Sequence, residues 1–258
     1  MGAYSGETIK QFEEAYEQWV PRQEKLMTAY MVQAYRSEKA SEYARHGLSR
    51  RLQSLRHGID RAFEAIPPEA EEPPSRDQLM DATAFIHSFL VSVYGGLDNI
   101  ARIWCWEAEV KDGKGRPLAD GQIGLGPKNT TVRDSLSNNL QDYLKGAAHW
   151  FEYLANYRHA VAHRIPVYIP PKTLSNEDGD EWRRIEEELV RAAKAGNFDE
   201  YDALFCAQKA LGRFEPVVTH SFGENARPVW LHGQMLCDFS TVIEIGEHML
   251  EELNGLDS

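Results

Sequence analysis

Residues 7–66 alternate apolar and polar positions with the period of an α-helix, and they contain few residues that break helices. We expect a helix from Glu7 to Trp19, a kink or restart at Pro21, and a helix that continues from there to Ala65. Proline fits the first turn of a new helix as well as an interior position where it bends one. The N-terminal quarter of the chain is therefore predicted to consist of long helices.

The middle of the chain predicts two helical regions with a linker before them and a loop between them. Residues 67–74 are rich in proline and glutamate, which is typical of a linker. The apolar stretch that follows, residues 77–109, predicts a long helix that begins behind a capping Ser or Asp. Five glycines and two prolines mark residues 111–128 as a loop. Helical periodicity then resumes at about residue 130 and continues to residue 163.

In the C-terminal part the sequence predicts two charged helices, at residues 179–195 and 198–211, joined by a Gly-Asn turn. A short β-hairpin at residues 214–232 and an amphipathic final helix at residues 234–253 follow. The predicted fold is therefore mainly α, a helical bundle with a small β-hairpin near residues 214–232. We expect residues 1–66 to form an N-terminal helical extension packed on a core domain of residues 77–258, so that the chain is one compact unit.

Composition and cysteine usage favour a cytoplasmic protein. The 258 residues are 42% hydrophobic and 26% charged, which is typical of a soluble globular chain. The three cysteines are far apart and form no Cys-x-x-Cys pair, so we expect buried thiols in a reducing compartment and no disulfide framework. The charge-free residues 82–97 are fewer than the roughly 20 apolar residues of a membrane span. The N-terminus lacks a secretory pattern.

The distribution of charge restricts the nucleic-acid interpretations. The net charge is −12; residues 1–66 carry 10 Lys and Arg against 9 Asp and Glu, whereas residues 67–258 carry 18 against 31. Affinity for a long nucleic acid comes from neutralising many phosphates, so an acidic body disfavours tracking along a duplex. A compact site around one or two phosphates stays compatible with this composition, because the local density of cations decides such binding.

Residues 158–164 contain two arginines and two histidines on an otherwise apolar helix, which the extended segment 165–171 then ends. Arginine holds a phosphate with a planar fork of donors, and histidine moves protons near neutral pH. A helix that only packs in the core would gain no stability from two arginines and two histidines at its end. We therefore interpret this segment as a functional site.

The helical geometry divides this cluster between two faces. Advancing by ~100° per residue places five polar side chains within one arc: His149, Glu152, Asn156, His159 and His163. Arg158 falls on the opposite, apolar side, where a charge is unfavourable unless it is paired. In a straight helix, Arg158 and His163 lie about 140° apart. They can meet on one phosphate if the helix loosens near Ile165, which precedes a proline, or if a second subunit completes the site.

The segment Arg158–His163 reads Arg-x4-His and resembles the motif of the HEPN superfamily, small α-helical proteins many of which are ribonucleases. The setting is also similar, because in that four-helix arrangement the motif closes a late helix and an earlier helix, here 77–109, packs beside it. Residues 164–171 resemble the corresponding segment of a subgroup of uncharacterised prokaryotic HEPN-like proteins. The resemblance extends over about residues 77–255.

The resemblance implies a metal-independent endoribonuclease without a cofactor, in which two motifs face each other across the two-fold axis of a homodimer. His163 would act as general acid or base when the RNA 2′-OH attacks the adjacent phosphate. Arg158 would orient that phosphate and stabilise its developing charge. The supporting or RNA-contacting candidates are His159, Asn156, Arg164, Tyr168, and either Asp98 or Asn99 from the earlier helix.

The chain departs from the HEPN toxins that pair with nucleotidyltransferase antitoxins. Those toxins usually carry a Tyr two residues after the His, where this chain has Ile165. That pairing and its tyrosine modification are therefore not supported, whereas a toxin or defence role with another protein partner or antitoxin stays open.

Three other interpretations of the same residues stay open. The first is a non-catalytic HEPN-like module that binds a nucleotide or a protein. The second is a metal site built on His159 and His163, with His149 and Glu152 extending the stripe, although the Glu-x-x-His pairs of a di-iron bundle are missing. The third is a structural bundle whose polar stripe is its exposed face.

Overall fold

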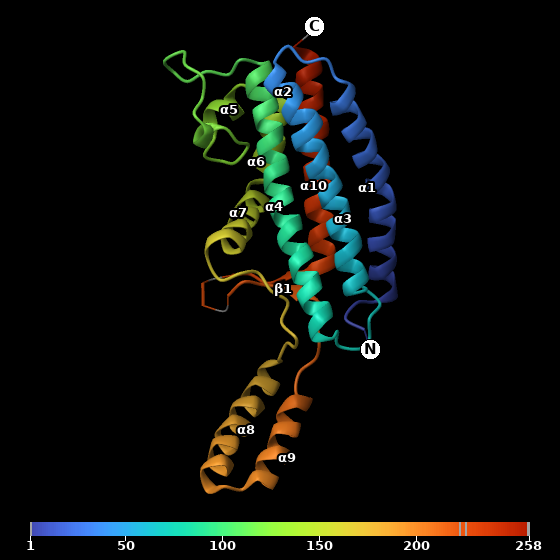
Figure 1. Cartoon of the computed structure of the whole chain (residues 1–258), viewed down its shortest axis with the longest axis vertical. Coiled ribbons are helices and arrows are strands. Elements are labelled where there is room, and N and C mark those ends of the chain that lie inside the picture. The colour runs from blue at the N-terminus through green and yellow to red at the C-terminus, as the bar shows by residue number, and fades with distance from the viewer. Residues whose placement is uncertain (1, 222, 225, 257–258) are drawn as a thin grey trace.

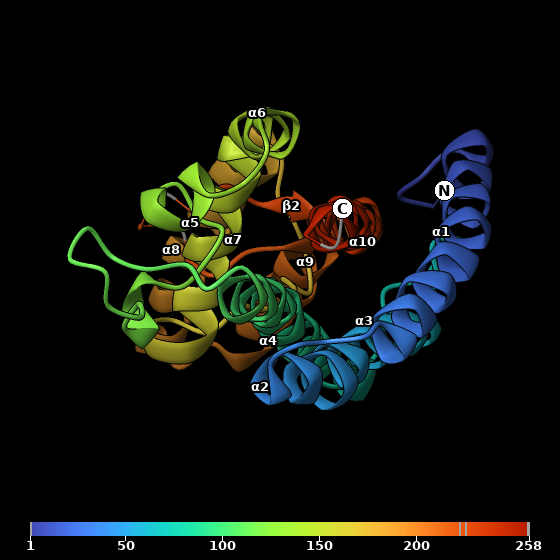
Figure 2. The same cartoon turned by 90° about the horizontal axis from the view of Figure 1, so that it is seen from above.

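The computed structural model describes residues 2–221, 223–224 and 226–256, and it is mainly α-helical with a small antiparallel hairpin, as predicted. Its long elements are α1 (Gly6–Val32), α3 (Ser49–Ala65), α4 (Arg76–Glu107), α7 (Ala148–His163) and α10 (Leu231–Gly255). Figures 1 and 2 both place α4 in the centre, with α3 on one side of it and α7 on the other. This arrangement makes α4 the scaffold against which α7 is positioned.

These helices share one apolar core. Each contributes a side chain that is at most 2% exposed, namely Leu26, Leu52, Ile100, Tyr157 and Val242 in chain order. Helix α3 packs along α4, and α1 packs along α10. The burial of these side chains is the main stabilising contribution to the fold. No helix within the described ranges combines the length and the apolar character needed to cross a bilayer.

The expected continuous helix from Arg22 to Ala65 is wrong. Helix α1 runs through Pro21 without ending there, and it stops at Val32. After a short turn the chain resumes as α2 (Glu38–Glu42), a π-helical turn η1 (Tyr43–Leu48) and α3.

A buried carboxylate from a distant helix explains this turn. The backbone N–H groups of Arg36 and Ser37 donate to the two carboxylate oxygens of Glu107, at 3.0 and 2.8 Å. Glu107 lies at the end of α4 and is 8% exposed. The Ser37 side chain in turn accepts the N–H of Ala40 and caps α2. Ser37 is a local signal for the start of α2, whereas residues 33–36 carry no helix breaker, so the end of α1 depends on this tertiary contact.

We expect Glu107→Ala to lower the free energy of unfolding by about 1–3 kcal/mol, because two backbone N–H groups lose their acceptor in a largely buried place. Glu107→Gln keeps one acceptor oxygen and should lose less stability. Urea unfolding of both variants measures the effect, with Glu42→Ala at an exposed position of α2 as control. Equal stability of Glu107→Ala and Glu42→Ala would show that the turn does not depend on this carboxylate.

Helix α4 begins as predicted and ends two residues early. Ser75 caps it, and Gln78 completes a capping box by accepting the backbone N–H of Ser75. The loop expected at residues 111–128 is confirmed, with one short 3₁₀ turn in it. The single helix expected over residues 130–163 is instead broken into three: α5 (Thr130–Asp134), α6 (Asn138–Gly146) and α7. Ser137 caps α6, and the Glu252 carboxylate of α10 accepts its backbone N–H at 2.9 Å.

Helices α8 (Asn176–Ala195) and α9 (Phe198–Ala210) are the two predicted charged helices, and they pack against each other. Gly196 ends α8 in the left-handed conformation, with φ of 70°. Figure 1 shows this pair projecting from the body of the molecule. None of the described residues of α9 is buried, so Cys206 is exposed there. Cys105 is buried as expected, whereas the burial expected for Cys206 and for Cys237 is wrong.

The hairpin is shorter than the predicted strands. β1 (Val217–Val218) pairs with β2 (Val229–Trp230), and α10 begins directly after β2. The extended segment after α7 runs beside β1, because Tyr168 and Thr219 exchange backbone hydrogen bonds of 2.8 and 3.0 Å. The hairpin therefore connects the end of α7 to the start of α10.

Candidate functional site

Helix α7 presents the two faces that its sequence predicts. On the apolar face that the spacing predicts, Leu154 and Tyr157 are buried, and Trp150 and Val161 are half-buried. Phe151 and Ala160 are buried beside them. On the other face lies the predicted polar stripe, in which Asn156 is half-buried. The other four side chains of the stripe are exposed: His149, Glu152, His159 and His163. The helix therefore offers its histidines to solvent along its whole length.

Arg158 is half-buried between α7 and α4. Its guanidinium carbon lies 4.9 Å from the centroid of the Tyr94 ring, within the range of a cation–π interaction. Asp98 lies one turn further along α4. Burial raises the pKa of the Asp98 carboxyl, while the positive charges of Arg102, Arg158 and Arg51 act to lower it. An aromatic face and a nearby carboxylate thus compensate the charge of Arg158 on the apolar side of α7.

The structure separates the two acidic-or-amide candidates of α4. Asp98 is close enough to Arg158 for the two charges to interact. Asn99 instead packs against the π-helical turn: a Cβ added to Gly47 would lie 2.6 Å from the Asn99 side-chain nitrogen. Asn99 therefore faces the π-helical turn, because its side chain leaves the helix about 100° away from that of Asp98.

His159 and His163 lie one turn apart on the exposed end of α7, with ring centroids 6.2 Å apart. Partial desolvation lowers the pKa of His159, and the positive charges of Arg158, Arg164, His163 and Lys128 lower it further. The end of α7 is thus locally basic although the protein is acidic. Within the residues that the structure describes, no group of three or more His, Cys, Asp and Glu side chains is placed to hold a metal ion.

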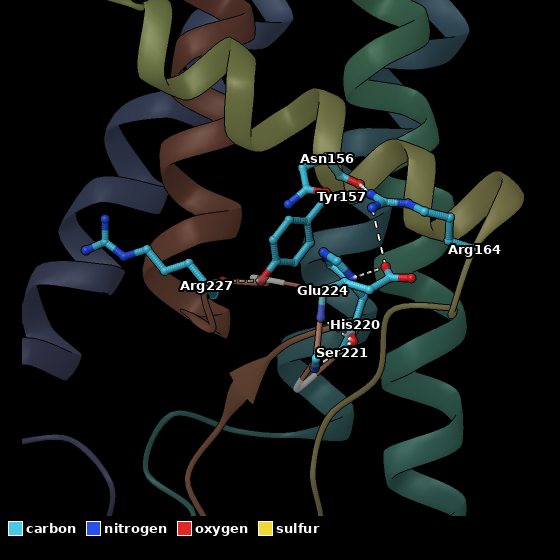
Figure 3. A network of polar contacts seen from close by, with 8 residues as sticks. Asn156, Tyr157, Arg164, His220, Ser221, Glu224 and Arg227 are labelled. Carbon is cyan, nitrogen blue, oxygen red and sulfur yellow. Dashed lines mark hydrogen bonds and ion pairs between the residues drawn. The ribbon is translucent and has the colours of Figure 1, made fainter.

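Arg164 and Asn156 bind each other rather than standing free. The Arg164 guanidinium donates to the carbonyl oxygen of Asn156 at 2.8 Å and also to its side-chain oxygen. It also forms an ion pair of 3.3 Å with Glu224 in the hairpin loop, as Figure 3 shows. Tyr168, the last supporting candidate, is half-buried beside β1, and burial raises the pKa of its hydroxyl. These residues join the end of α7 to the hairpin.

His220, in the hairpin loop after β1, is a residue that the sequence did not single out. It is fully buried, and the edge of its ring meets the ring of Tyr157 with centroids 5.3 Å apart. Neither ring nitrogen has a hydrogen-bond partner among the described residues, and the Glu224 carboxylate lies 3.9 Å from Nδ1. Burial and the charge of Arg164 lower the pKa of His220, against an opposing effect of Glu224. Nothing local in the sequence marks it, since its neighbours come from α7.

The two motif residues do not converge on one face of a single chain. Helix α7 stays regular through His163, and the backbone becomes extended only at Arg164. The expected loosening therefore comes after both residues, and the separation of about 140° around the helix persists. No family model, curated protein or solved structure matches this chain, so its function is inferred from the residues and the geometry described above.

Proposed function

We propose that this protein is a metal-independent endoribonuclease of the HEPN type, whose active sites form between two copies of the chain. The observation that carries the proposal is the placement of Arg158: its charge is held on Tyr94 near Asp98, and it lies beside a locally basic end of α7 that exposes His159 and His163. In this proposal, residues 77–258 form a HEPN-like bundle, and residues 1–66 are an extension packed on it.

The proposed reaction needs one cation and one proton-transfer group at the phosphate. The RNA 2′-oxygen forms a bond to the adjacent phosphorus, and the bond from phosphorus to the 5′-oxygen breaks, which leaves a 2′,3′-cyclic phosphate. His163 takes the proton of the 2′-OH while water protonates the leaving 5′-oxygen, or it gives a proton to the 5′-oxygen while water takes that of the 2′-OH. Arg158 binds the non-bridging oxygens, whose negative charge increases in the transition state.

A two-fold dimer reconciles these roles with the geometry of α7. Arg158 and His163 leave opposite sides of the helix, so one chain alone presents them in different directions. If two copies of α7 cross near their C-terminal ends, Arg158 of one subunit lies opposite His163 of the other. A two-fold axis then creates two equivalent sites. The contact between Arg164, Asn156 and Glu224 supports the ends of α7 in this arrangement.

The test is to incubate the purified protein with mixed RNA, with and without EDTA, and to identify the product ends. The proposal expects EDTA-resistant cleavage that leaves 2′,3′-cyclic phosphates, and no cleavage of RNA with 2′-O-methyl groups. Cleavage that EDTA abolishes would favour a metal site at His159 and His163. Binding of RNA or nucleotides without cleavage would favour the non-catalytic module and contradict the ribonuclease.

A further inference from the structure

A cleft of about 770 Å³ opens between the first turns of α7, the hairpin loop and the start of α10. Its volume lies within the range of pockets that hold small ligands. Polar and aromatic groups dominate its walls, including His149, Glu152, Asn156, Arg227 and Trp230. Three of these residues belong to the same polar stripe of α7 as His159 and His163, so the cleft and the proposed catalytic end share one surface.

Trp230 offers an aromatic surface at this cleft. The residue ends β2 and is 45% exposed. Its ring packs against the ring of Tyr4, with centroids 5.4 Å apart, and the Tyr4 hydroxyl lies 3.0 Å from Nδ1 of the buried His232. The indole is therefore held in place from behind while much of it faces solvent. Rigid exposed aromatic rings are the groups on which unpaired bases stack.

Arg227 supplies a cation at the same cleft that pairs with none of the described residues. The Tyr157 hydroxyl lies 2.7 Å from the carbonyl oxygen of Arg227, which anchors this part of the backbone to α7. Figure 3 shows the guanidinium extending away from the network of Asn156, Arg164 and Glu224. Its side chain forms no ion pair or hydrogen bond with the described residues, in contrast to that of Arg164. A guanidinium beside an exposed indole suits a phosphate next to a stacked base.

Hydrogen bonds to a buried carboxylate hold two side chains at the floor of the cleft in place. The Tyr153 hydroxyl and the Gln234 amide both donate to the buried Asp238 carboxylate, at 3.2 and 2.8 Å. The exposed Glu152 carboxylate on the wall is an acceptor of the kind that binds the exocyclic amine of a base. Binding to groups that are already ordered loses little conformational entropy.

We propose that this cleft binds one unpaired ribonucleotide, with its base stacked on Trp230 and its phosphate paired with Arg227. The distance along α7 from Asn156 in the cleft to His163 is about 10 Å, so one strand can occupy both places. The assignment to an RNA strand rests on the proposed ribonuclease function, whereas the recognition of a nucleotide unit does not.

The experiment measures binding without cleavage. Eight-residue 2′-O-methyl oligonucleotides and free ribonucleoside monophosphates are titrated into the full-length protein, followed by tryptophan fluorescence and by anisotropy of labelled oligonucleotide. We expect saturable quenching that disappears in Trp230→Ala, and an affinity lower by about tenfold or more in that variant, since each stacked base contributes substantially to binding. Arg227→Ala should weaken binding and reduce its salt dependence. Trp182→Ala, an exposed tryptophan of α8, should bind normally.

The possible results separate this inference from the ribonuclease proposal. Binding that depends on Trp230 and Arg227, together with no cleavage of ordinary RNA, supports the cleft and contradicts the ribonuclease. If the protein cleaves RNA and both substitutions leave binding unchanged, the proposed nucleotide site in the cleft is wrong and the ribonuclease proposal is unaffected. If the oligonucleotide binds and the mononucleotides do not, the cleft takes part of an RNA strand. If both bind with equal affinity, the cleft is a site for free nucleotides. Loss of fold in Trp230→Ala is checked by circular dichroism, and Arg227→Ala then carries the test.

Discussion

Replacing Arg158 or His163 with alanine is expected to lower the rate of RNA cleavage by about 10²–10⁴-fold, the range in which single acid–base or charge-stabilising groups contribute. His163 is exposed at the end of α7, so its loss should change chemistry with little effect on the fold. Arg158 also packs on Tyr94, so its replacement removes a cation–π contact of modest energy. Initial rates on a defined oligoribonucleotide measure both effects.

Two further variants separate a chemical role from a structural one. Arg158→Lys keeps the positive charge near Asp98 but removes the planar fork that binds phosphate, so we expect a folded protein that is still strongly impaired. His46→Ala replaces an exposed histidine of the π-helical turn and should cleave at the wild-type rate. If His163→Ala and His46→Ala cleaved equally well, His163 would have no part in the reaction.

The buried carboxyl of Asp238 predicts the second large effect, a loss of stability as pH rises. Asp238 is 1% exposed, and it accepts hydrogen bonds from Trp150 and Gln234 at 2.8 Å and from Tyr153 at 3.2 Å. Burial raises its pKa from 3.8 to about 7, although these hydrogen bonds act to lower it. This carboxyl connects α10 to α7 and so helps to position the helix that carries the candidate site.

The sign of the effect follows from where the proton is bound. Between pH 4 and 7 the folded protein holds a proton on Asp238 that the unfolded chain has released, so stability is greatest below the unfolded pKa. The contribution of Asp238 to the free energy of unfolding falls as pH rises to about 7, and above that pH it no longer changes. The whole change amounts to about 4 kcal/mol.

Asp238→Asn should remove this dependence, because an amide does not titrate. We expect the free energy of unfolding of Asp238→Asn, relative to the wild type, to improve by about 4 kcal/mol from pH 4 to pH 8 in urea titrations. Asp238→Leu leaves three donors unsatisfied and should be destabilised at every pH. A difference between Asn and wild type that stays constant with pH would show that Asp238 does not titrate in this range.

The elements that sequence patterns predicted well are those determined by nearby residues. The Ser75 cap, the Gly196 turn and the buried and exposed faces of α7 all follow from local spacing, and the structure confirms them. The breaks near residues 33–37 and at residue 137 carry only a partial local signal, because Ser37 and Ser137 cap the helices that follow but no breaker ends the helices before them. Their backbone N–H groups bind Glu107 and Glu252, carboxylates that lie far along the chain.

The candidate site shows the same division between local and distant information. Helical periodicity placed Arg158 apart from the polar stripe, and the structure adds Tyr94 and Asp98 as the groups around it. The sequence could not show which of Asp98 and Asn99 lies near Arg158, because that depends on which helix packs against each side of α4. His220 and the Trp230 cleft depend on a hairpin loop that returns to α7, and no spacing rule connects those segments.

The central claim is that each active site takes Arg158 from one subunit and His163 from the other, and mixing the two inactive variants tests it most directly. If subunits pair at random, about half of the dimers contain both variants, and each of these dimers has one complete site, so activity should return to about a quarter of the wild-type rate. Differently tagged Arg158→Ala and His163→Ala proteins, co-purified to show that mixed dimers form, provide this measurement. Mixed dimers that regain no activity, or wild-type protein that cleaves RNA as a monomer, would contradict the composite site.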